Sequence, residues 1–110
     1  MNKMATINET LGFLQNLYFG QIANGIKLRI ILSNGSSPEE VEALKAERRR
    51  IEADIYPIAR NLSEFADIAR LGAYHTFIGS AVGREAEMAR ADYDVLLRQM
   101  QAKRHHHRRH

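Results

Sequence analysis

The sequence contains no cysteine, no glycine-rich phosphate-binding loop and no long run of apolar residues. Without cysteine, neither a disulfide framework nor a thiolate metal site is available. Gly72, Gly79 and Gly83 lack the spacing and the Lys-Ser/Thr end of a nucleotide-binding loop. The longest uncharged interval, 10–26, has 17 residues, includes Gln and Asn, and is about three residues short of a bilayer span. We therefore expect no nucleotide site, no secretory signal and no membrane-spanning segment, and we disfavour a membrane-surface role.

Positive charge is concentrated near the C-terminus. The formal net charge is +3, yet the last 13 residues hold five positive charges and no acidic residue, so that residues 1–97 carry a net charge of −2. The segment 103–110, KRHHHRRH, contains nothing suited to burial, and we expect it to be disordered. Its cations would attract a polyanion such as nucleic acid. The candidate contacts are Lys103, Arg104, Arg108 and Arg109.

A first helix is predicted over about 6–33. Thr6 and Glu9 have the spacing of a capping box, which favours a helix start at Thr6. Apolar residues then recur at helical spacing until little of the circumference is polar, so we expect this surface to be buried, in part by another chain. The alternation within 26–32 also fits a short strand paired with a neighbouring subunit, but we favour helix because the chain offers no second strand. The first-helix apolar surface comprises Leu11, Leu14, Leu17, Tyr18, Phe19 and Ile22.

A second helix is predicted over about 37–71. Ser37 provides an N-cap, Pro38 suits the first helical position, and the two acids that follow face the positive end of the helix dipole. From Val41 to Ala69, residues at steps of three and four form a coiled-coil-like seam. Pro57 lies within it and predicts a kink near 54–56 rather than an end, because the apolar register continues. The self-association seam comprises Val41, Leu44, Arg48, Ile51, Ile55, Ile58, Leu62 and Phe65.

A third helix is predicted over about 80–102, after a glycine-containing connection at 71–80. Its stripe, from Val82 to Met100, again steps by four and three. The fold class is therefore all-α: a helical hairpin or three-helix bundle in a single domain, 1–102, followed by the tail.

No catalytic constellation, metal site or cofactor site is predicted. His75 has no nucleophile pattern beside it, and we interpret it as a structural or surface residue. The acids of the third helix alternate with arginines, which favours a solvated face with the ion pairs Glu87–Arg90 and Asp94–Arg98 over a cation site. The run 48–50 is likewise interpreted as a helix face rather than a phosphate contact.

The excess of apolar surface predicts a non-enzymatic, self-associating helical structural or adaptor protein. The capped helical hairpin and basic tail resemble the small helical structural proteins of tailed phages, such as head-to-tail adaptors and connectors. This resemblance implies a homo-oligomer in the cytoplasm or in a virion assembly, with other assembly proteins as partners. The alternative is an oligomeric nucleic-acid-binding accessory protein that uses the basic tail.

Overall fold

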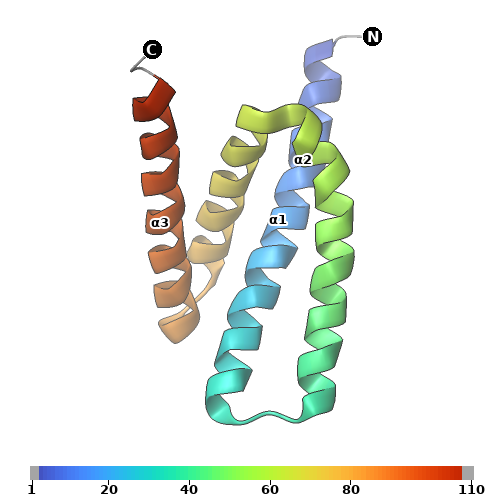
Figure 1. Ribbon diagram of the computed structural model, residues 1–110, viewed down its shortest axis with the longest axis vertical. Helices are drawn as coiled ribbons and strands as arrows, with labels where there is room; N and C mark the ends of the chain where they lie inside the picture. Colours follow the sequence, from blue (N-terminus) through green and yellow to red (C-terminus); the bar gives the residue numbers. More distant parts are fainter. Residues whose placement is uncertain (1–2, 108–110) are drawn as a thin grey trace.

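Three α-helices account for nearly all of residues 3–107, the part of the chain that the computed structural model describes (Figure 1). They are α1 (Lys3–Asn34), α2 (Pro38–Ser80) and α3 (Gly83–His107). The predicted all-α fold is confirmed, and the described residues form no strand. The strand alternative for 26–32 is wrong, because this segment continues α1 and buries Ile26 and Leu28.

The start of α1 differs from the prediction. Thr6 lies inside the helix, where its carbonyl oxygen accepts a hydrogen bond of 2.9 Å from the Thr10 hydroxyl. The capping-box assignment is therefore wrong, because the residues before Thr6 include good helix formers and no breaker. At the other end, Gly35 takes a positive φ of 76°, which favours glycine and lets the chain turn toward α2.

The start of α2 is as predicted. The Ser37 side chain accepts a hydrogen bond of 3.2 Å from the Glu40 backbone N–H, and Pro38 is the first helical residue. Glu39 and Glu40 occupy the first turn, next to the positive end of the helix dipole. Cap, proline and acids together account for the abrupt start of α2.

A break at Ser63 divides α2 into two helical segments, 38–62 and 64–80. Ser63 has φ 38° and ψ −100°, and the chain reverses direction there (Figure 1). The change of direction predicted near 54–56 thus occurs after Pro57, at a residue that no sequence signal marked. Proline removes one backbone donor but keeps a helical φ, and Pro57 is exposed, so water can satisfy the carbonyl that it leaves free.

The predicted connection over 71–80 is wrong, because this stretch is the second segment of α2. Its buried residues, which include Ala69, Ala73 and Phe77, continue helical spacing. Gly72 permits a close approach rather than a turn: a Cβ built there would lie 2.6 Å from the side-chain oxygen of Gln15. Small residues at this face let the second segment lie close to α1.

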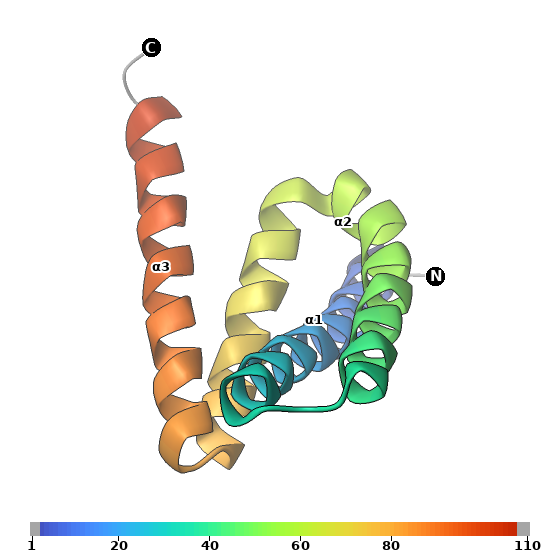
Figure 2. The same ribbon diagram turned by 60° about the horizontal axis from the view of Figure 1, so that its bottom comes forward.

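The core is organised around α1, which lies between the two segments of α2 in both ribbon views (Figures 1 and 2). On one side, the buried Asn24 side chain donates a hydrogen bond of 2.9 Å to the Leu44 carbonyl oxygen. On the other, the Phe19 and Phe77 rings pack with centroids 5.6 Å apart. Leu14 is fully buried and Ile26 is 2% exposed. Burying each such side chain contributes about 1.5–3 kcal/mol to folding.

α3 packs antiparallel to the second segment of α2 and buries Ala86, Ala89 and Leu96. Figure 2 shows that α3 and α1 diverge toward the C-terminal end of α3. The helix continues through His107, so the disorder expected for 103–110 is contradicted for 103–107. Lysine and arginine are good helix formers and extend it. Residues 108–110 lie outside the described part.

Candidate functional site

Most of the predicted seam packs against α1 of the same chain. Leu44 and Ile55 are buried, and Ile51, Ile58 and Leu62 are partly buried against the core. Val41, at the start of the seam, is partly exposed. The first segment of α2 therefore uses its apolar stripe to cover α1 rather than leaving it for a second chain.

Two seam residues, Arg48 and Phe65, do not share this packing. Arg48 is exposed, and its Nε donates to Glu52 Oε1 at 2.8 Å on the same helix. Phe65 is 49% exposed, whereas Ala66 and Ala69 are buried. The break at Ser63 changes which residues face inward, so the prediction of one continuous register as far as Phe65 is wrong.

The first-helix apolar surface lies in the core. Leu14, Tyr18 and Ile22 are buried. Leu11, Leu17 and Phe19 are partly buried and pack against the same cluster. The cover comes from both segments of α2, because the reversal at Ser63 brings the second segment back along α1.

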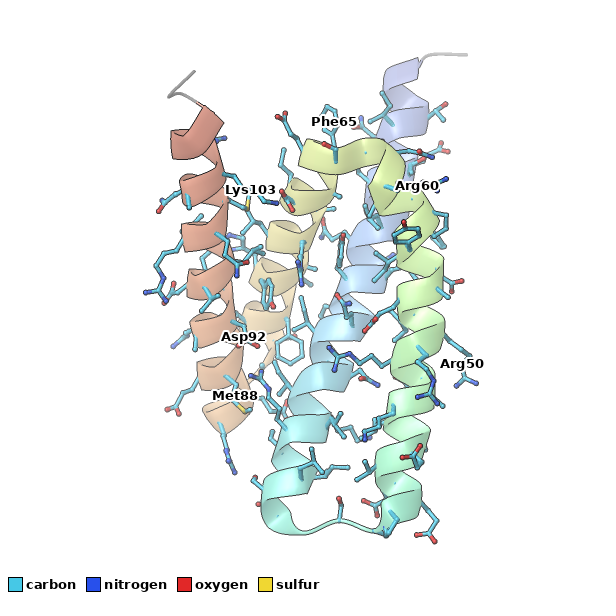
Figure 3. All side chains as sticks on the ribbon, viewed as in Figure 1. Arg50, Arg60, Phe65, Met88, Asp92 and Lys103 are labelled. Atoms are coloured by element: carbon cyan, nitrogen blue, oxygen red, sulfur yellow. The ribbon has the colours of Figure 1, made fainter. Side chains whose placement is uncertain are left out.

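A groove lies where α2 bends, next to two of the exposed large apolar side chains, Phe65 and Ile68, whereas Phe13, Leu32, Tyr56, Val82 and Val95 are also exposed and do not line it. This bend groove has a volume of about 690 Å³ and runs between the bend and the C-terminal part of α3. Ile68, which lines it, is 57% exposed, and Phe65 projects from the same bend (Figure 3). The bend groove is lined by Tyr18, Ala59, Ser63, Glu64, Ala66, Asp67, Ile68, Met100, Lys103 and Arg104.

The two walls of the bend groove carry opposite charges. The α2 wall contributes the acids Glu64 and Asp67, and the α3 wall contributes Lys103 and Arg104. Lys103 Nζ lies 3.9 Å from Asp67 Oδ2, and the Lys103 side chain is 72% exposed. A pair at this distance contributes little to folding, and the Lys103 ammonium remains available to another charged surface, whereas the Asp67 side chain is 30% exposed.

The candidate polyanion contacts are only partly brought together. Lys103 and Arg104 lie side by side at the bend groove, on a helix rather than on a loose arm. Arg108 and Arg109 lie outside the described residues.

Two buried tyrosines lie near these surfaces, and burial raises the pKa of both. For Tyr18, in the bend groove, Asp67 adds to this rise in the pKa and Arg70 opposes it. For Tyr74, deeper between the helices, the Asp92 carboxylate adds to the rise in the pKa and the neighbouring arginines oppose it.

The residues considered for chemistry are widely separated. His75 is exposed, and its Nε2 lies 3.2 Å from the Tyr93 hydroxyl oxygen. In the described part of the chain, no three His, Asp or Glu side chains are grouped so that they could hold a metal ion.

The predicted ion pairs along the third helix, Glu87–Arg90 and Asp94–Arg98, do not occur among the described side chains. Asp92 instead pairs with Arg29 of α1, at 2.6 Å for Oδ2 to Nη2 and 3.3 Å for Oδ1 to Nη1. A guanidinium offers two parallel donors to a carboxylate, and this fork-like pair joins α1 to α3. This pair could not be predicted from the sequence, because the two residues are 63 positions apart.

Comparison of the chain with protein-family models, with curated proteins and with solved structures found no match. Over the described residues, no helix combines the length and apolar character needed to cross a membrane.

Proposed function

We propose that this chain is a non-enzymatic, self-associating helical structural or adaptor protein, and that a second copy binds at the bend groove. One observation carries the proposal: the bend groove combines the exposed side chain of Ile68 and the partly buried Met100 with an acidic wall on α2 and a basic wall on α3. Opposite charges on the two walls make the surface complementary to itself.

A two-fold dimer satisfies this arrangement. In such a dimer the same surface is used by both copies, and the α2 wall of one copy faces the α3 wall of the other. Asp67 then faces Lys103 of the second copy, and the apolar floor around Ile68 is removed from water by both chains. Long-range charge complementarity fixes the register, while apolar burial stabilises the contact.

The wider role rests on the resemblance to small helical proteins of tailed phages. Assembly proteins of this kind act by contact and need no cofactor, which agrees with surfaces built for binding. A place in the cytoplasm or in a virion assembly, and contacts with other assembly proteins, belong to this proposal.

Light scattering after size-exclusion chromatography tests the proposal on two variants. Wild-type protein is expected to give twice the chain mass of 12.6 kDa. Ile68→Asp places a charge on the groove floor and should weaken association by at least about tenfold. Ile68 is 57% exposed, so the variant should keep its helical circular dichroism spectrum.

Val82→Asp provides the matched control. Val82 is 82% exposed and does not line the bend groove, so this variant should associate as wild type does. Equal loss of association in both variants, or none in either, would contradict the bend groove as the interface.

Short DNA duplexes test whether nucleic acid, rather than a second copy, occupies the bend groove. If wild-type protein releases its second copy on binding DNA, Lys103 and Arg104 are nucleic-acid contacts.

A further inference from the structure

Two adjoining cavities lie away from the bend groove, the larger between all three helices and the smaller between α2 and α3. Their volumes are about 300 Å³ and about 250 Å³, and both are lined by Arg70, Tyr74 and Asp92. Arg29 and Arg48 also line the larger one. We refer to the two cavities together as the interhelical pocket. Its larger part is at the lower end of the range for small-molecule sites.

Positive charge exceeds negative charge in the interhelical pocket. Three guanidinium groups line it against the single carboxylate of Asp92, which Arg29 already pairs at 2.6 Å. Arg48 also lines the larger cavity, and its Nε donates to Glu52 Oε1 at 2.8 Å. The interior therefore has more cationic donors than anionic acceptors.

Arg70 adds to this excess of cationic donors. Its Nε is buried and has no hydrogen-bond partner within residues 3–107. Its guanidinium lies over the Tyr18 ring, with Cζ 5.6 Å from the centroid. This cation–π contact supplies no hydrogen-bond acceptor to the guanidinium. Arg70 lines both cavities, and no carboxylate pairs with it among the described side chains.

Tyr74 supplies a neutral donor beside this group. The side chain is 8% exposed, it lines both cavities, and its hydroxyl has no hydrogen-bond partner in the described part of the chain. The hydroxyl of a tyrosine is protonated at neutral pH at its ordinary pKa of 10.0, and burial raises the pKa of Tyr74 further. A protonated hydroxyl next to guanidinium groups is suited to a ligand made of acceptor oxygens.

We infer that the interhelical pocket binds a small tetrahedral oxyanion, a phosphate or the phosphate group of a small monoester. Arg70 and Tyr74 donate hydrogen bonds to its oxygens, and Arg48 balances its charge from the first segment of α2. Asp92 is the one group that opposes the ligand, because its carboxylate repels an anion and holds the Arg29 guanidinium. This site is independent of the proposed self-association.

Isothermal titration with inorganic phosphate at low ionic strength tests the site, with glycerol 3-phosphate as a second arm. Both ligands should bind to the wild-type protein. Tighter binding of glycerol 3-phosphate would assign a monoester, and equal binding would assign the free ion. No heat of binding from either ligand at millimolar concentration would overturn the inference.

Three variants of the interhelical pocket should change phosphate binding in different directions: two should weaken it and one should strengthen it. Arg70→Lys should weaken phosphate binding by about tenfold, because an ammonium lacks the parallel donors of a guanidinium. Tyr74→Phe should weaken it by about fivefold through the loss of one neutral hydrogen bond. Asp92→Asn should strengthen it by about tenfold, because it removes the repelling charge and releases Arg29.

Arg50→Lys is the matched control, since Arg50 is on the same helix as Arg70 and points away from the other helices (Figure 3). It should leave phosphate binding unchanged. The inference fails if Arg70→Lys binds phosphate as tightly as Arg50→Lys does, or if Asp92→Asn binds it more weakly than wild type. A purely structural role of these residues predicts weaker binding in every variant that loosens the fold.

Discussion

At the scale of single residues, Tyr18 and Tyr74 link the stability of the fold to pH. Burial raises the pKa of both hydroxyls above the ordinary value of 10.0. Both are neutral in the folded and the unfolded chain well below that value, so their contribution to stability is fully present there. As the pH rises past it, the unfolded chain loses these protons first, and the free energy of unfolding decreases.

Tyr74→Phe and Tyr18→Phe should therefore each reduce the loss of stability between about pH 9 and about pH 11. A group that is protonated only in the folded chain changes the free energy of unfolding by at most about 1.4 kcal/mol per pH unit. Urea denaturation followed by circular dichroism measures this slope. Tyr56→Phe, at a tyrosine that is 65% exposed, serves as the control and should keep the wild-type slope. An unchanged slope in both buried-site variants would contradict the account.

Sequence patterns within one helix predicted the role of a single residue only where its interactions lie within that helix. Ser37 and Pro38 start α2 as expected, because a cap requires nothing beyond its own helix. The fork between Arg29 and Asp92, and the cavity around Arg70, depend on residues far apart in the sequence. No periodicity of a single helix contains that information.

At the scale of helices, the break at Ser63 determines the architecture. A straight α2 would expose one side of α1, whereas the reversal returns the second segment along that side. From the sequence, the helix was predicted to change direction near Pro57, because proline is a frequent cause of helix kinks. The stripe Ala66, Ala69, Ala73 and Phe77 is the signal that identifies 71–80 as helix, since it continues helical spacing through Gly72.

Ser63→Gly should stabilise the protein by about 1 kcal/mol, because φ 38° is unfavourable for a residue with a Cβ and permitted for glycine. The midpoint of urea denaturation measures the change. Ser63→Ala keeps the Cβ and should show no such gain. If Ser63→Gly instead destabilises the protein by about 1 kcal/mol, as glycine does within a continuous helix, then α2 does not break at this residue.

At the scale of the whole molecule, the sequence correctly indicated three helices and more apolar surface than a straight hairpin covers. It could not show which chain provides the cover, because packing within a chain and packing between chains require the same stripe. The structure places most of the seam and the first-helix surface in the core of one chain. The apolar surface that remains exposed is smaller, and at the bend it includes Phe65 and Ile68.

The charges on the walls of the bend groove allow a direct test of self-association through this groove. Asp67→Lys places a cation opposite Lys103, and Lys103→Glu places an acid opposite Asp67, while Glu64 and Arg104 are unchanged. Each variant alone should associate about tenfold more weakly than wild type at low ionic strength, because like charges then face each other across the two-fold contact. Within each chain, the substitution also replaces attraction between the two walls by repulsion. Association that is recovered when the two variants are mixed can therefore arise only from contacts between chains.

The deciding measurement is the mass, by light scattering, of an equimolar mixture of Asp67→Lys and Lys103→Glu. In a mixed pair, the substituted and native charges at positions 67 and 103 of one chain face opposite charges on the other. Two variants that associate weakly alone should therefore form a heterodimer of twice 12.6 kDa. A mixture that associates no more strongly than either variant alone would contradict self-association through the bend groove.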